Sequence, residues 1–221
     1  MWLIFGGWAF SPDILRPVFG NDARYVDTNT LMPYIVDDET LRGDWVDVVC
    51  KAIASFVPEQ PFGIAGWSTG AIIAWAVAAR LKAEKVVLLS ATPSFCSREE
   101  FKSGWRASIL HSMREKLSTN ANKVVADSRE RCGCTNPARA DTFTQAQLRA
   151  GLIFLEFANL LPLSKTSVPA RLLHGSGDRI VSIDAGRSFA EQTGIALDEY
   201  AGGHVFFLTN AGPIRTKLAL I

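Results

Sequence analysis

The stretch Gly66-Trp67-Ser68-Thr69-Gly70 constrains this chain more than any other, because it places a serine between two glycines where the secondary structure changes. The apolar run 62–65 before it predicts a buried strand, and the Ala-rich run 69–82 predicts a helix. Such a tight turn strains the serine backbone, and flanking glycines leave room where a Cβ atom would clash. We therefore predict that Ser68 is a nucleophile raised above a sheet edge, with a helix N-terminus behind it. The alternative is an ordinary strand–helix turn that happens to contain a serine.

Strand and helix patterns alternate on both sides of this turn. Apolar runs predict six strands, at 2–5, 24–28, 62–65, 85–90, 169–174 and 197–200. Helical spacing predicts helices at 13–19, 40–57, 69–82, 183–192 and from about 211 onward. Strands that alternate with helices form parallel sheets covered on both faces. The sequence therefore predicts an α/β fold with a doubly wound, mostly parallel sheet of about six strands.

The alternation stops between the fourth and fifth predicted strands. This interval contains mainly helical patterns, at 98–117, 122–131 and 144–161. We expect a single domain, 1–221, with a helical insertion at about 93–166. The insertion could merely add packing layers, but we favour a cap, because ligands of open α/β sheets bind beyond the carboxyl ends of the strands.

Composition limits the class of protein. Of the 221 residues, 48% are hydrophobic and 20% are charged, and the formal net charge is +1. This balance is typical of a soluble globular protein and argues against binding to nucleic acid or to a membrane surface. No apolar run is long enough to span a bilayer, and the N-terminus lacks the features of a signal peptide. We expect a cytoplasmic monomer.

The cysteines fit reduced thiols better than a zinc site. They are Cys50, Cys96, Cys132 and Cys134, and the last two have no second Cys or His pair at metal-binding spacing. We expect neither a metal nor a cofactor.

A serine hydroxyl is a weak nucleophile at neutral pH and needs a base beside it. The chain has three histidines. His204 follows a glycine turn after the last predicted strand, at the sheet edge where Ser68 would lie. His111 falls within the helical insertion, and His174 closes a strand and is more typical of a structural residue. We predict that His204 is the base, the alternative being a histidine on a surface loop.

The carboxylate that orients this histidine should follow another strand end. Asp178 does so, in Gly175-Ser176-Gly177-Asp178 after the strand 169–174. The alternative is a loop aspartate that makes only a local turn, with Asp184 and Asp198 as the other candidates.

A tetrahedral intermediate on Ser68 would need N–H donors for its oxyanion. We assign one donor to the backbone N–H of Thr69, the residue after the nucleophile. The second should come from the loop after the first strand, Gly6-Gly7-Trp8, and we assign it to the backbone N–H of Trp8. The indole of Trp8 could pack in the core at the same time.

The order Ser68, Asp178, His204 resembles the α/β-hydrolase superfamily, and the likeness covers nearly the whole chain. Within it, the chain is similar to the pimeloyl-[acyl-carrier-protein] methyl ester esterases of biotin synthesis. The similarity lies in Gly7-Trp8, in the tryptophan before Ser68, in Ser90-Ala91-Thr92-Pro93-Ser94-Phe95, and in the segments 151–160 and 168–169. Gly6 departs from that family, which has histidine there, and the predicted sheet starts at the oxyanion strand.

The resemblance implies a serine carboxylesterase that hydrolyses the methyl ester of pimeloyl-acyl-carrier protein. The open alternatives are a short-chain esterase, a thioesterase, a C–C bond hydrolase or a non-catalytic binding protein, because the fold does not fix the activity.

Two further groups of residues could serve such a substrate. Segment 97–165 carries 11 Lys and Arg against 7 Asp and Glu, which suits an acidic carrier protein but also a solvated helical surface. We predict docking at Arg129, Arg131 and Arg139. The aromatic residues that could line an acyl channel beside Trp8, or simply fill the core, are Trp67, Phe95, Trp105, Phe143, Phe154 and Phe206.

Overall fold

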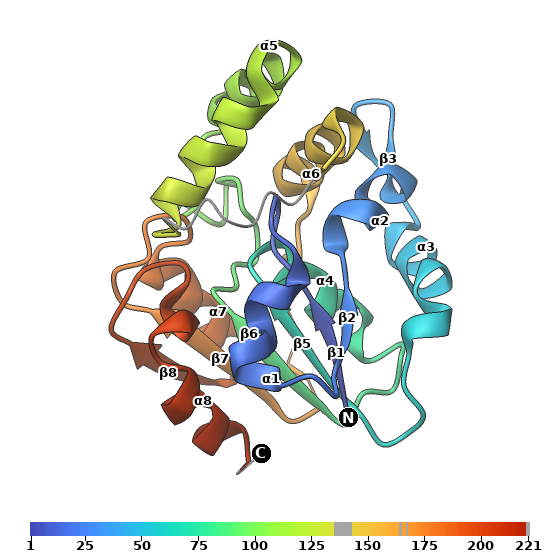
Figure 1. Ribbon diagram of the computed structural model, residues 1–221, viewed down its shortest axis with the longest axis vertical. Helices are drawn as coiled ribbons and strands as arrows, with labels where there is room; N and C mark the ends of the chain where they lie inside the picture. Colours follow the sequence, from blue (N-terminus) through green and yellow to red (C-terminus); the bar gives the residue numbers. More distant parts are fainter. Residues whose placement is uncertain (135–142, 164, 167, 220–221) are drawn as a thin grey trace.

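The computed structural model describes residues 1–134, 143–163, 165–166 and 168–219. One six-stranded sheet, with strand order β2-β1-β5-β6-β7-β8, forms its centre (Figure 1). The strands are β1 (Trp2–Phe5), β2 (Arg24–Val26), β5 (Gly63–Trp67), β6 (Lys85–Leu89), β7 (Ala170–Gly175) and β8 (Ala196–Tyr200). All pairings in this sheet are parallel, which confirms the predicted doubly wound sheet.

The chain changes direction across the sheet between β1 and β5. It runs from β1 outward to β2 and then returns to the other side of β1 to form β5. A crevice forms at such a switch point, beyond the carboxyl ends of the two strands. Trp8 follows β1 and Ser68 follows β5, so both predicted site residues lie at this crevice.

Helices cover both faces of the sheet (Figure 1). Leu3 and Phe5 of β1 pack in one core, to which α3 (Trp45–Ala52), α4 (Thr69–Ala78) and α7 (Ile183–Thr193) contribute. Ile4 points to the opposite core, shared with α1 (Arg16–Phe19) and α8 (Ala211–Leu218). Because both faces are buried, the strands are apolar at successive positions rather than at alternate ones.

Two helices follow β6 and lie over the carboxyl end of the sheet, at the top of Figure 1. They are α5 (Ala107–Arg131) and α6 (Gln145–Phe157). The break predicted between 117 and 122 is a kink inside α5, where Asn120 has non-helical φ and ψ of −154° and 73°. Thr144 and Gln147 form a capping box at the start of α6. We propose that these helices belong to a cap, with the predicted limits of about 93–166.

The structure corrects the sequence prediction in several places. The helix predicted at 144–161 ends at Phe157. The helix predicted at 40–57 is shorter, because Thr40–Leu41 form β4, which pairs with β3 (Val36–Asp37) in a hairpin. Residues 98–106 are not helical. The helix α2 (Thr28–Ile35) was not predicted, since it contains Pro33 and opens with polar residues. Short 3-10 helices lie at Pro12–Leu15, Ala54–Phe56 and Phe206–Leu208.

None of the helices in the described ranges combines the length and the hydropathy that a bilayer crossing requires.

Candidate active site

The strand–turn–helix stretch places Ser68 between β5 and α4 in a strained conformation, with φ of 57°. The flanking glycines are required by close approaches of the backbone. A Cβ atom on Gly66 would collide with the carbonyl of Gly70, and one on Gly70 would collide with the carbonyls of Phe5 and Gly6. Ser68 itself is half-buried. The local sequence thus builds the sharp turn that the pattern predicted.

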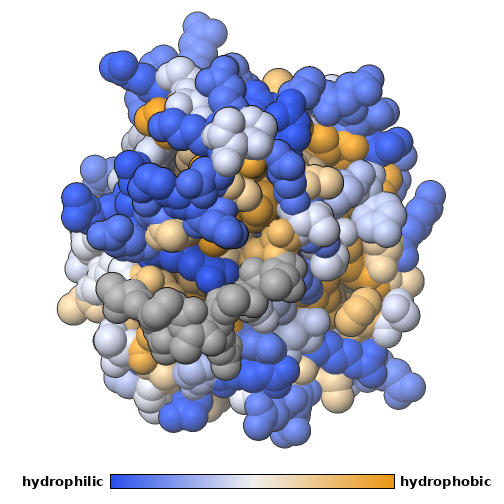
Figure 2. Space-filling model, turned by 45° about the horizontal axis from the view of Figure 1, so that its top comes forward, coloured by the Kyte–Doolittle hydropathy of each residue, from blue (hydrophilic) through white to orange (hydrophobic). Residues whose placement is uncertain are grey.

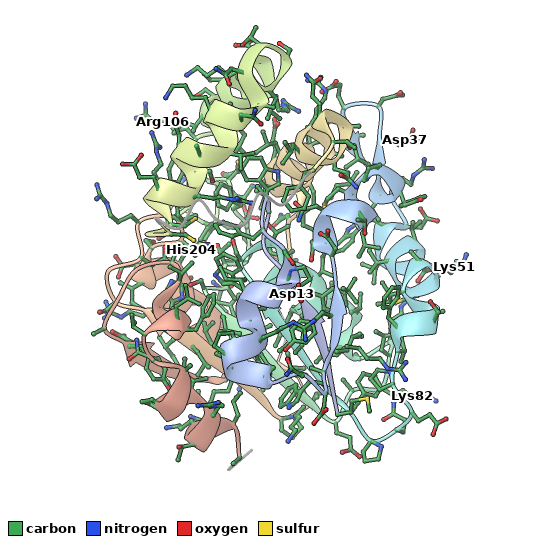
Figure 3. All side chains as sticks on the ribbon, in the orientation of Figure 1. Asp13, Asp37, Lys51, Lys82, Arg106 and His204 are labelled. Atoms are coloured by element: carbon green, nitrogen blue, oxygen red, sulfur yellow. The ribbon has the colours of Figure 1, made fainter. Side chains whose placement is uncertain are left out.

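The structure brings His204 and Asp178 into direct contact. His204 Nδ1 lies 2.7 Å from Asp178 Oδ2, and both side chains are buried. The other carboxylate oxygen, Oδ1, accepts hydrogen bonds from the backbone N–H groups of Ile180 and Val181, at 2.8 and 3.0 Å. These bonds fix the carboxylate and therefore the imidazole. His204 lies near the lower end of α5 in Figure 3.

The electrostatics keep Asp178 ionised. Burial alone would raise the pKa of Asp178, but His204, His174 and the backbone amide of Ile180 outweigh it and hold the pKa below its usual value. An ionised carboxylate beside Nδ1 favours the imidazole tautomer with its proton on Nδ1. That tautomer leaves Nε2 free to accept a proton.

In the described part of the chain, the other candidates for base and acid form no hydrogen bond or ion pair with His204. His174 Nε2 donates to the Val181 carbonyl at 2.9 Å and lies 3.5 Å from Asp178 Oδ2, so this histidine supports the loop around Asp178. Burial lowers the pKa of His174, which favours its neutral form. His111 pairs with Glu156 on α6 at 2.6 Å. The two alternative carboxylates form ion pairs away from His204: Asp184 with Arg187, and Asp198 with Arg171 and Lys217.

The loop after β1 lies against the turn that carries Ser68. A Cβ atom on Gly7 would lie 2.9 Å from the Trp67 ring and 3.5 Å from Ser68 Cβ, so only glycine fits this approach. The Trp8 indole points away from the sheet and donates to the Leu148 carbonyl of α6 at 2.9 Å. Gly151 provides the space for that ring, because a Cβ there would collide with it. Trp8 thus joins the β1 loop to α6.

Ser68 and His204 line the same cavity, which has a volume of about 300 Å³. Trp8 and Thr69, which carry the two predicted oxyanion donors, also line it. Residues of α5 and α6 form the opposite wall, including Leu110, Met113 and Leu152. Hydrophobic side chains also line the hollow between hydrophilic surfaces on the face shown in Figure 2. A mostly apolar cavity with a few polar groups is typical of a small-molecule site.

The predicted aromatic residues divide into two groups. Trp67, Phe95 and Trp105 line the cavity, with Phe95 and Trp105 stacked at 6.0 Å. Phe154 instead packs in the core against Trp45, with ring centroids 5.3 Å apart. Phe143 packs against the core that contains Leu3 and Phe5, and Phe206 lies in the opposite core, which contains Ile4. Neither of them lines the cavity.

Trp67 also supports the site. Its indole N–H donates to the backbone carbonyl of His204 at 3.0 Å, and the two rings lie 5.1 Å apart. The tryptophan before the serine therefore holds the residue that follows the last strand.

The predicted docking arginines occupy different environments. Arg131 is exposed and lines the cavity. Arg129 is half-buried, and its Nε and Nη2 donate to the Ala9 carbonyl at 3.1 and 2.7 Å while its guanidinium covers the Phe10 ring. Arg139 lies outside the described residues. Of the two described arginines, only Arg131 has the exposure that docking requires.

Cys132 lines the cavity as well, but it is a poor nucleophile. Burial raises the pKa of its thiol to about 12, so the thiolate is scarce at neutral pH.

Sequence reasoning missed Asn29, which is buried beside the β1 loop. Its amide contacts three residues of that loop: Gly7, Ala9 and Phe10. The available signal was its position just after β2, at the carboxyl edge of the sheet, where polar residues in parallel sheets often belong to the site.

Comparison with known proteins places the chain in a family. Residues 43–215 match the model of the thioesterase domain. The chain belongs to this family. A pimeloyl-[acyl-carrier protein] methyl ester esterase of Xylella fastidiosa (strain M23) is 30% identical over 191 residues, which cover 77% of this chain and 73% of that protein. A protein of the same name from Nitrosomonas europaea is 27% identical, and that match spans 64% of this chain but only 62% of the relative's length.

Among solved structures, an esterase from Exiguobacterium antarcticum matches this thioesterase-domain chain with a TM-score of 0.77 and 14% identity, over 100% of this chain and 91% of that chain. The fold is therefore the α/β-hydrolase fold predicted from the sequence. Family and relatives together make the protein an ester-hydrolysing enzyme.

Proposed function

We propose that the enzyme uses Ser68 as nucleophile, His204 as general base and Asp178 as the group that orients His204. The observation that supports this most is the buried Asp178–His204 pair, 2.7 Å apart, beside a cavity that Ser68 also lines. Ser68 Oγ attacks the ester carbonyl carbon while His204 Nε2 takes its proton. The backbone N–H groups of Trp8 and Thr69 stabilise the resulting oxyanion.

The tetrahedral intermediate then collapses. The C–O bond to the leaving group breaks, and His204 returns its proton to the departing oxygen. Water, deprotonated by His204, attacks the acyl-serine in the second half of the cycle. The acid leaves, and Ser68 recovers its proton. Asp178 remains ionised throughout and stabilises the imidazolium form of His204.

For the substrate, we propose the methyl ester of pimeloyl-acyl-carrier protein, within biotin synthesis. Two relatives at 27–30% identity are named for this reaction, and the apolar cavity suits an aliphatic dicarboxylate chain. The leaving group would be methanol. The thioester that joins the acyl chain to its carrier would remain intact.

A second candidate activity is hydrolysis of that thioester. It is favoured by the family match over residues 43–215, since the same serine, base and oxyanion donors can cleave either bond. The substrate's position in the cavity would then determine which carbonyl meets Ser68.

One substrate separates these two activities, because methyl-pimeloyl-acyl-carrier protein contains both bonds. Intact-mass measurement of the carrier distinguishes the products: methyl-ester hydrolysis removes one CH₂ from the mass, and thioester hydrolysis returns the holo-carrier. We expect the first product, and none with Ser68→Ala. Predominant release of holo-carrier would establish the thioesterase instead. Growth of a biotin auxotroph blocked at demethylation tests the same proposal in the cell.

We propose that Arg131 contacts the acidic carrier protein, because its side chain is exposed at the cavity. Arg131→Glu should weaken activity on the carrier-linked ester, and added salt should weaken the wild type, since exposed charge attractions are screened. Hydrolysis of a short p-nitrophenyl ester should stay unchanged. Equal losses on both substrates would contradict a docking role. Docking by Arg139, and a monomeric state, stay predictions.

A further inference from the structure

We infer that Asn29 is a positioning residue for the oxyanion hole. The inference rests on the proposed function, because it assumes that the backbone N–H of Trp8 receives the oxyanion. Asn29 lies in the first turn of α2, beside the β1 loop, and is only 1% exposed.

The orientation of the Asn29 amide is fixed by its neighbours. Its Oδ1 lies 2.8 Å from the backbone nitrogen of Ala9, which can only donate. Its Nδ2 faces three oxygen acceptors: the carbonyls of Gly7 and Phe10, at 3.3 and 3.2 Å, and the Asp27 carboxylate at 3.0 Å. A flipped amide would place oxygen against oxygen at all three positions. The donor side of Asn29 therefore faces Gly7.

The contact with Gly7 acts on the proposed oxyanion donor through one peptide unit. The Gly7 carbonyl and the Trp8 N–H belong to the same planar peptide and point in opposite directions. Holding the carbonyl on one side therefore fixes the direction of the N–H on the other. A hydrogen bond accepted by the carbonyl also polarises the peptide and strengthens the donor.

Ala9, the residue after Trp8, shows that the β1 loop needs support from other elements. Ala9 has φ of 58°, in the left-handed region that costs an alanine about 1–2 kcal/mol. Asn29 accepts from its N–H, and Arg129 of α5 donates to its carbonyl. The strained residue is thus held from both sides by side chains that are distant in sequence. The Gly7 carbonyl also accepts a hydrogen bond from the Phe10 N–H, at 3.4 Å. Without Asn29, the Gly7–Trp8 peptide would lose one of these two contacts and be held less firmly.

Two variants test this role. Asn29→Asp keeps the shape and the acceptor for Ala9, but it replaces the donor that faces Gly7. Asn29→Ala removes both. We expect kcat on a short p-nitrophenyl ester to fall about 10-fold to about 100-fold in each variant, with KM nearly unchanged. This loss should not exceed the loss caused by removing a whole oxyanion donor.

A matched control is available in the preceding residue. Thr28 is equally buried, and its hydroxyl has no hydrogen-bond partner among the described residues. Thr28→Val should leave kcat within about twofold of the wild type. The affinity for an alkyl boronic acid, which forms a tetrahedral adduct with serine, should fall in parallel with kcat in the Asn29 variants. A merely structural role would not give this parallel loss with an unchanged KM.

The outcomes separate this inference from the proposed function. If Ser68→Ala retains activity, the proposed function fails, and the Asn29 role fails with it. If Ser68→Ala is inactive but folded Asn29 variants keep normal kcat, only the inference is overturned. Should both Asn29 variants fail to fold, a crystal structure of the wild type with a boronate on Ser68 decides. We expect a boronate oxygen on the Trp8 N–H and the Gly7 carbonyl on Asn29, and a boronate oxygen bound elsewhere would refute the role.

Discussion

Asp178→Asn is the substitution for which the structure gives the sharpest expectation. Asp178 accepts three hydrogen bonds, two at Oδ1 from backbone N–H groups and one at Oδ2 from His204. An asparagine would keep its oxygen on the two amides, because its NH₂ group cannot accept from them. Its NH₂ group would therefore face His204 Nδ1.

This arrangement forces the wrong tautomer of His204. Nδ1 would have to accept from the new amide, so the ring proton would move to Nε2, on the side that should take a proton from Ser68. We expect kcat to fall on the order of 10⁴-fold, which corresponds to about 5.5 kcal/mol in the activation free energy. The free energy of unfolding should fall much less, by about 1.5–3 kcal/mol, because the three hydrogen bonds can still form and lose only the negative charge of their acceptor.

The assay compares steady-state hydrolysis of a short p-nitrophenyl ester with urea unfolding of the same preparations. Asp184→Asn provides the matched control, since Asp184 is exposed and pairs only with surface Arg187 among the ion pairs described. We expect that control to keep its kcat within about twofold. A folded Asp178→Asn enzyme that loses less than about tenfold in kcat would refute the assignment of Asp178.

Three further substitutions test other parts of the structure. Arg129→Met should lower the free energy of unfolding by about 2–3 kcal/mol and reduce kcat on small esters, because it removes the bonds to Ala9. Arg131→Met is the control. Equal changes in stability and in kcat for the two variants would contradict this role of Arg129. Gly70→Ala should prevent stable folding, since its Cβ would collide with two backbone carbonyls; a folded, active variant in a thermal melt would be inconsistent with the tight turn. His174→Gln should flatten the pH dependence of stability: burial lowers the pKa of His174, so below about pH 6.5 the unfolded chain binds a proton that the folded protein does not, and the wild type loses up to about 1.4 kcal/mol per pH unit on acidification. Urea unfolding of the wild type and of His174→Gln at about pH 7.5 and about pH 5 measures this dependence. The same change in unfolding free energy with pH in both proteins would argue against a neutral buried histidine.

The local sequence determined the turn around Ser68 and the sheet that carries it. Gly66 and Gly70 mark the turn because backbone sterics act between near neighbours, and the apolar runs mark strands because both faces of a parallel sheet are buried. The same reasoning failed at 40–57, where Leu41 has helical spacing but pairs with Val36 in a hairpin. Pairing partners in a hairpin are chosen by contacts outside the local window, so apolar spacing alone could not distinguish the two structures.

Only the tertiary structure decided which side chains meet. The sequence favours Asp178 by its place after a strand end but leaves Asp184 and Asp198 open, and only Asp178 among them contacts His204 in the described structure. Arg129 and Arg131 are two residues apart on one helix, and one supports the Ala9 loop while the other faces the cavity. Asn29 carries no local signature of its contact with Gly7. These differences depend on strand register, helix orientation and loop path, which arise from packing between distant segments and so leave little trace in any short stretch of sequence.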